Sequence, residues 1–142
     1  MDLIKSFFSK PIIAFACFIS FFLLSIYLFT LPKSGLQRFD WITIPYFDKI
    51  VHILTFFILF FLFTHFLHTI IKPKRITLFI ALISLTIYGI SVEFIQEKYI
   101  SGRSFEQLDI LADISGCVLF LIISFLVRKK IGPDGNRGRN QN

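Results

Sequence analysis

The chain has 142 residues, of which 55% are hydrophobic and 20 are phenylalanine, and its formal net charge is +6. Its mean hydropathy of +0.74 exceeds that of ordinary soluble domains. A soluble protein of this size could not bury so much apolar surface, so the composition excludes that class and indicates a protein whose solvent is the lipid bilayer. The basic residues lie at the ends of apolar segments, a distribution that argues against nucleic acid as a partner.

Four apolar stretches follow one another along the chain, at residues 11–31, 50–71, 76–95 and 108–127. Each has about the 20 residues that a helix needs to cross the hydrocarbon core, and none alternates as a barrel strand would. The first stretch is longer than a signal-peptide core and is interpreted as a retained span. The sequence therefore predicts an all-α bundle of four transmembrane helices. We expect one domain over 1–131 and a disordered basic tail over 132–142.

The flanks of these stretches predict an orientation. Lysine and arginine gather before the first stretch, between the second and third, and after the fourth, at Lys5, Lys10, 72–75 and 128–130. Because cytoplasmic loops are enriched in basic residues, both the N-terminus and the C-terminus are expected in the cytoplasm.

Ionisable residues inside three of the spans carry the functional signal, because each is costly to insert into a membrane. With a rise of about 1.5 Å per residue, His52, Glu93 and Asp109 fall in one layer near the non-cytoplasmic surface, and Asp113 lies somewhat deeper. Each shares a helix face with a second polar residue, in the pairs Asp48–His52, Glu93–Gln96 and Asp109–Asp113. We expect these faces to meet in one pocket, with Lys49 and Arg103 at its rim. Glu97, Lys98 and Glu106 are interpreted as solvated loop charges.

These residues suggest two kinds of role. His52, Glu93 and Asp109 can act as acid/base groups or bind a divalent cation, and acid/base chemistry is favoured because no compact ligand motif such as HExxH is present, so no metal site is predicted. The expected ligand contacts are Lys49, Arg103, Gln96, Asp48 and Asp113. The alternative is that the polar cluster only locks the helices together. No cofactor or oligomeric state is indicated.

The order of these motifs resembles a known family. Asp48-Lys49-x-x-His52, Glu93-x-x-Gln96, Gly102-Arg103-Ser104 and Ala112-Asp113-x-x-Gly116 resemble the VanZ-like family of bacterial membrane proteins over residues 40–120. The resemblance implies a multi-pass protein of the bacterial cytoplasmic membrane, acting in the cell envelope, with glycopeptide (teicoplanin) resistance in some members. It suggests an anionic lipid, a lipid-linked wall precursor or a glycopeptide as partner. The family usually has Asn where this chain has Asp113.

Overall fold

The computed structural model describes residues 10–32 and 47–131, and this part of the chain is all helical. It contains α2 (Pro11–Thr30), α4 (Phe47–Ile70), α5 (Lys74–Tyr99) and α6 (Gln107–Ile131). All four helices are long and apolar enough to cross a membrane, which confirms the predicted all-α, multi-pass fold class. The predicted tail over 132–142 lies outside the described residues.

Helices form here because lipid offers no partner for backbone N–H and C=O groups, so each span must satisfy its own. Pro11 stands at the start of α2, where its missing N–H costs nothing, and Pro73 directly precedes α5. Three helices, α4, α5 and α6, extend beyond their apolar stretches. The helix α4 begins at Phe47 and α5 ends at Tyr99, so Asp48 and Lys49 are helical. The prediction of a loop position for Glu97 and Lys98 was wrong, because both lie in the last turns of α5.

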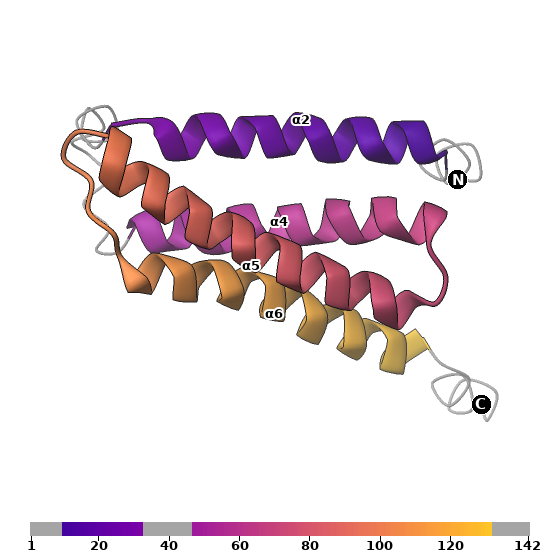
Figure 1. The fold of residues 1–142 in the computed structure, drawn as a ribbon. Coiled ribbons are helices and arrows are strands. Elements are labelled where there is room, and N and C mark those ends of the chain that lie inside the picture. Colours follow the sequence, from indigo (N-terminus) through magenta and orange to yellow (C-terminus); the bar gives the residue numbers. More distant parts are fainter. Residues whose placement is uncertain (1–9, 33–46, 132–142) are drawn as a thin grey trace, which may run out of the picture.

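Helices that follow one another in the chain run in opposite directions, and α4 packs against the other three, most extensively against α6, which runs parallel to it (Figure 1). Phe56, Leu59 and Phe60 of α4 are completely buried and form the centre of the core. Large apolar side chains cover the outside of the bundle; among them are Ile12 and Phe79, which are 83% and 64% exposed. An apolar exterior around a packed interior is what a helix bundle presents to lipid.

Two glycines shape the structure around the polar residues. At Gly116 a Cβ atom would collide with the backbone oxygen of Ile53, so glycine permits the close approach of α6 to α4. Gly102 has a φ of +79° in the α5–α6 connection, a conformation that glycine adopts without strain. The start of α4, the end of α5 and the start of α6 therefore lie together at one end of the bundle (Figure 1). The start of α2 and the end of α6 lie at the other end.

Candidate functional site

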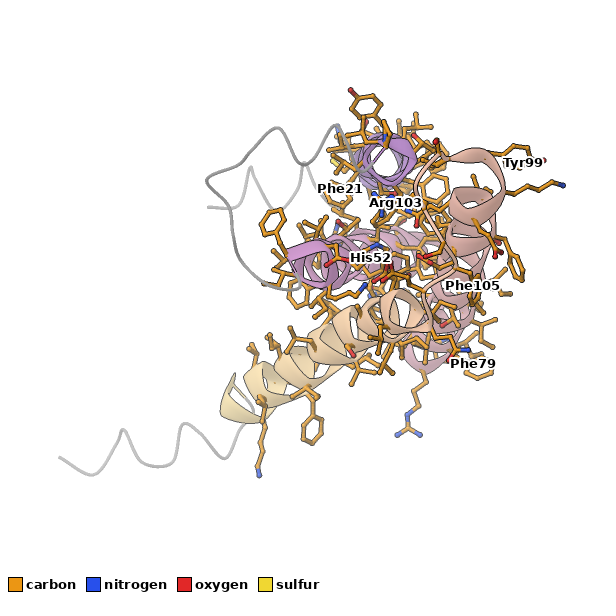
Figure 2. All side chains as sticks on the ribbon, turned by 90° about the vertical axis from the view of Figure 1, so that its left-hand side faces the viewer. Phe21, His52, Phe79, Tyr99, Arg103 and Phe105 are labelled. Atoms are coloured by element: carbon orange, nitrogen blue, oxygen red, sulfur yellow. The ribbon has the colours of Figure 1, made fainter. Side chains whose placement is uncertain are left out.

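A buried polar cluster occupies the end of the bundle where α5 turns into α6. Its innermost members are His52 of α4, Glu93 of α5, and Asp109 and Asp113 of α6, each at most 2% exposed. Figure 2 views the bundle from this end and shows His52 in its interior, between the other helices. Three helices thus contribute ionisable groups to one buried volume.

His52 is fixed from two sides. Its Nδ1 lies 2.8 Å from Asp113 Oδ1, a hydrogen bond in which the imidazole N–H donates to the carboxylate. The Phe29 ring of α2 packs against the imidazole, with 4.5 Å between ring centroids. The other ring nitrogen, Nε2, lies 3.8 Å from Asp109 Oδ2, which is beyond hydrogen-bond distance. Asp113 therefore orients the imidazole so that Nε2 faces Asp109.

Lys49 joins the buried cluster to the surface. Its ammonium forms ion pairs with Asp48 at 2.9 Å, with Glu106 at 2.5 Å and with the buried Asp109. The interpretation of Glu106 as a solvated loop charge was therefore wrong. The spacing of Glu106 is a signal that could have found it. Glu106 precedes Asp109 by three residues, so the two side chains can lie on the same side of the chain at the start of α6. Asp48 and Glu106 are partly exposed, so the buried acids continue into an acidic rim around Lys49.

Glu93 is held by one carboxylate oxygen only. Its Oε2 accepts a hydrogen bond of 3.0 Å from the backbone N–H of Glu106. Its Oε1 is buried and has no hydrogen-bond partner among the described residues. A buried acceptor without a partner is costly, so this oxygen is available to a ligand.

Two of the expected ligand contacts, Gln96 and Arg103, instead bind carbonyl groups at the end of α2. Gln96 Nε2 donates to the Phe29 oxygen at 2.9 Å, and Arg103 Nη2 donates to the Leu31 oxygen at 3.3 Å. Figure 2 shows Arg103 between α2 and α4. The Arg103 Nε is buried without a hydrogen-bond partner in the described part of the chain, so the guanidinium keeps donor capacity.

In the described part of the chain, two groups of side chains have donor atoms close enough to hold a metal ion. One is His52, Glu93 and Asp109, whose donor atoms lie within 4.8 Å of one another, and all three are buried. The other is Asp48, Glu106 and Asp109. These three carboxylates already surround the Lys49 ammonium, which occupies the position that a cation would take.

A separate cavity of about 410 Å³ lies between α4, α5 and α6, away from the predicted site residues. His65, His68 and Arg128 are among its lining residues. The sequence placed the two histidines near the opposite, basic end of the second span, and the structure keeps them apart from the His52 cluster.

The buried cluster combines an oriented imidazole, carboxylates from two further helices and an arginine with spare donors. Such a set can bind a charged group, exchange protons or hold a cation. Comparisons with protein-family models, curated proteins and solved structures find no match for this chain.

Proposed function

We propose that this chain is a VanZ-like protein of the bacterial cell envelope whose polar cluster engages the anionic head group of a lipid. One observation supports it above all: His52, Glu93 and Asp109 come from three spans and are buried together, while Glu93 Oε1 has no hydrogen-bond partner among the described residues. Ionisable residues inside spans are costly to insert and are generally kept for function. A cluster with a free polar atom favours a ligand site over simple packing.

The position of the cluster suits a lipid ligand. It lies at one end of the helices, and the exterior of the bundle is apolar, so in a membrane this end would lie near the lipid head groups. A phospholipid, a lipid-linked wall precursor or a lipid-anchored glycopeptide can keep its tail in the bilayer while its head group enters the cluster.

The basic flanks favour an orientation in which this end of the bundle faces the outer leaflet of the cytoplasmic membrane and both termini lie in the cytoplasm. Precursors of the bacterial wall and glycopeptides are both found on that side. The resemblance to the VanZ-like family supports a contribution to glycopeptide (teicoplanin) resistance.

Within the site, we assign anion binding to Arg103 and candidate acid/base roles to His52, Glu93 and Asp109. Arginine presents a planar fork of N–H donors that matches phosphate or carboxylate, and Arg103 keeps its Nε for such a contact. His52 is suited to proton exchange because Asp113 holds its Nδ1 and leaves Nε2 facing the other acids.

The test is the substitution Arg103→Lys, which keeps the charge and removes the fork. Native mass spectrometry of the detergent-solubilised chain would count bound phosphatidylglycerol against a zwitterionic competitor. Farnesyl diphosphate would serve in parallel as a probe for lipid-linked diphosphates.

Loss of a charge-assisted bidentate contact in Arg103→Lys should weaken lipid binding at least about tenfold. The control is Arg75→Lys, at an exposed arginine at the start of α5, at the other end of the bundle. Unchanged binding by Arg103→Lys would remove Arg103 from the ligand site.

A second candidate function has its own support: the cluster as a structural lock. Lys49 joins α4 to α6, and both Gln96 and Arg103 fasten their segments to the end of α2. If locking is the whole role, alanine at His52 or Glu93 should lower the amount of folded protein. If the cluster is a ligand site, alanine should abolish function while the protein stays at the wild-type level.

A further inference from the structure

We propose that His52, Glu93 and Asp109 hold a divalent cation of the zinc or manganese class. Each side chain comes from a different helix, each is at most 2% exposed, and their donor atoms lie within 4.8 Å of one another. Donor atoms of a tetrahedral zinc site lie about 3.3–3.5 Å apart. The 3.8 Å between His52 Nε2 and Asp109 Oδ2 is close to that spacing, so these two donors need only a small inward movement to bind one zinc ion.

Asp113 gives the imidazole the support that metal-binding histidines require. Such a histidine usually donates its second ring N–H to a carboxylate or carbonyl, which fixes the tautomer and aims the remaining nitrogen at the metal. The bond between His52 Nδ1 and Asp113 Oδ1 at 2.8 Å has this form. It leaves the lone pair of Nε2 directed toward Asp109.

Glu93 supplies an independent indication of a ligand. One of its oxygens is anchored by the backbone N–H of Glu106, whereas Oε1 is buried and has no hydrogen-bond partner among the described residues. The side chain is 0% exposed, so water at the surface does not satisfy it. A cation bound beside this oxygen would offset the cost of burying it.

The balance of charge also favours a cation. The buried and half-buried residues described at this end include five acids and two bases besides His52; the acids are Asp48, Glu93, Glu106, Asp109 and Asp113, and the bases are Lys49 and Arg103. Lys49 already forms ion pairs with Asp48, Glu106 and Asp109. An anionic head group would be repelled by the remaining formal negative charge. A divalent cation would offset most of that negative charge and could bridge the carboxylates to the head group.

The donor set narrows the kind of cation. One imidazole nitrogen and two carboxylate oxygens suit zinc or manganese, whereas magnesium prefers oxygen donors alone. Three protein ligands leave a coordination position open, as in catalytic zinc sites. The inference rests on the proposed function only for the fourth ligand of the cation, which would be a phosphate oxygen of the lipid head group at the open coordination position.

The experiment measures zinc retained by the full, untagged chain in phosphatidylcholine nanodiscs after exposure to zinc chloride and desalting. Elemental analysis should find about one zinc per chain for the wild type, the content of a single three-ligand site. In Glu93→Gln, zinc affinity should fall at least about tenfold, since even loss of a supporting group costs that much. The matched control is Glu97→Gln, at an exposed residue one turn later on α5, which should retain zinc like the wild type.

A second measurement uses the wild type alone. Zinc should raise its thermal unfolding midpoint, and a chelator should reverse the rise. A wild type that retains no zinc and gains no stability from it would overturn the cation site. Equal retention by Glu93→Gln and the wild type would overturn it as well. Zinc retention in a chain that shows no preference for phosphatidylglycerol supports the cation site and contradicts the proposed function. Phosphatidylglycerol binding that depends on Arg103 in a chain that retains no zinc supports the proposed function and contradicts the cation site.

Discussion

At the scale of single residues, Asp113 illustrates how a buried acid can act without touching a ligand. Its Oδ1 accepts from His52, and that one bond determines which ring nitrogen faces Asp109. Asp113 is therefore a positioning residue in this account. Asparagine at this position would offer the same carbonyl acceptor without a formal charge.

Substitution of Asp113 should separate hydrogen bonding from charge. Asp113→Asn should keep zinc binding close to that of the wild type, because the amide oxygen still accepts from Nδ1. Asp113→Leu should lower zinc affinity by about 10–100-fold, because the imidazole loses its orienting partner. Isothermal titration of the purified chain with zinc measures both. Equal losses in the two variants would show that the charge of Asp113, and not its acceptor oxygen, is what the site uses.

Some residues of the site could be identified from the sequence, and others could not. His52, Glu93, Asp109 and Asp113 could be identified because ionisable groups stand out inside apolar spans, and the helical rise gives their depth. Glu106 was misjudged, because an acid just before a span looks like a solvated loop residue until its partner Lys49 is known. The carbonyls of Phe29 and Leu31 carry no side-chain signal, so their role as acceptors could not be predicted.

At the scale of helices, the existence of the four elements followed from the lengths of the apolar stretches. Their ends and partners did not. The helix α4 includes Asp48 and Lys49 because helical hydrogen bonding continues past the apolar stretch, and the two side chains pair with each other. Which helix lies at the centre depends on packing over the whole bundle. The sequence does not reveal which helix approaches Gly116, and the structure shows that it is α4.

The contact at Gly116 gives a prediction about stability. In Gly116→Ala the new methyl group would meet the backbone of Ile53 and Phe57, which cannot rotate away as a side chain can. Overpacking of this kind should lower the free energy of unfolding by about 1–3 kcal/mol. Unfolding by a denaturing detergent in mixed micelles measures it, with Ser115→Ala at the neighbouring exposed position as the control. Equal stability of the two variants would contradict the close approach of α4 and α6.

At the scale of the whole molecule, the two ends of the bundle differ in chemistry. One end buries acids, a histidine and Lys49, and the other end begins α5 with a basic segment and carries Arg128 near the end of α6. Basic flanks at one membrane surface and a polar site at the other would follow from a protein that is anchored by its cytoplasmic side and works at the outer leaflet.

Reporter fusions test this orientation. A reporter that is active only in the cytoplasm should be active when fused after Lys129 and silent when inserted at Gly102, in the α5–α6 connection. An export-dependent reporter at the same two positions should give the opposite pattern. Activity of the cytoplasmic reporter at Gly102 would place the cluster at the inner leaflet and remove the outer-leaflet ligand from consideration.

The central claim is that the buried cluster is a ligand site and not a lock, and Glu93→Gln tests it most directly. Glutamine keeps an oxygen to accept from the Glu106 N–H and removes a formal charge from a cluster that has more acids than bases. The measurement is phosphatidylglycerol binding and unfolding stability on the same purified sample. We predict that binding falls at least about tenfold, because the cation that would bridge the protein to the head group loses a ligand. Stability measured without added zinc should stay the same or rise, as is common when a site residue is neutralised. Retained binding together with a loss of stability would contradict the account and identify the cluster as a lock.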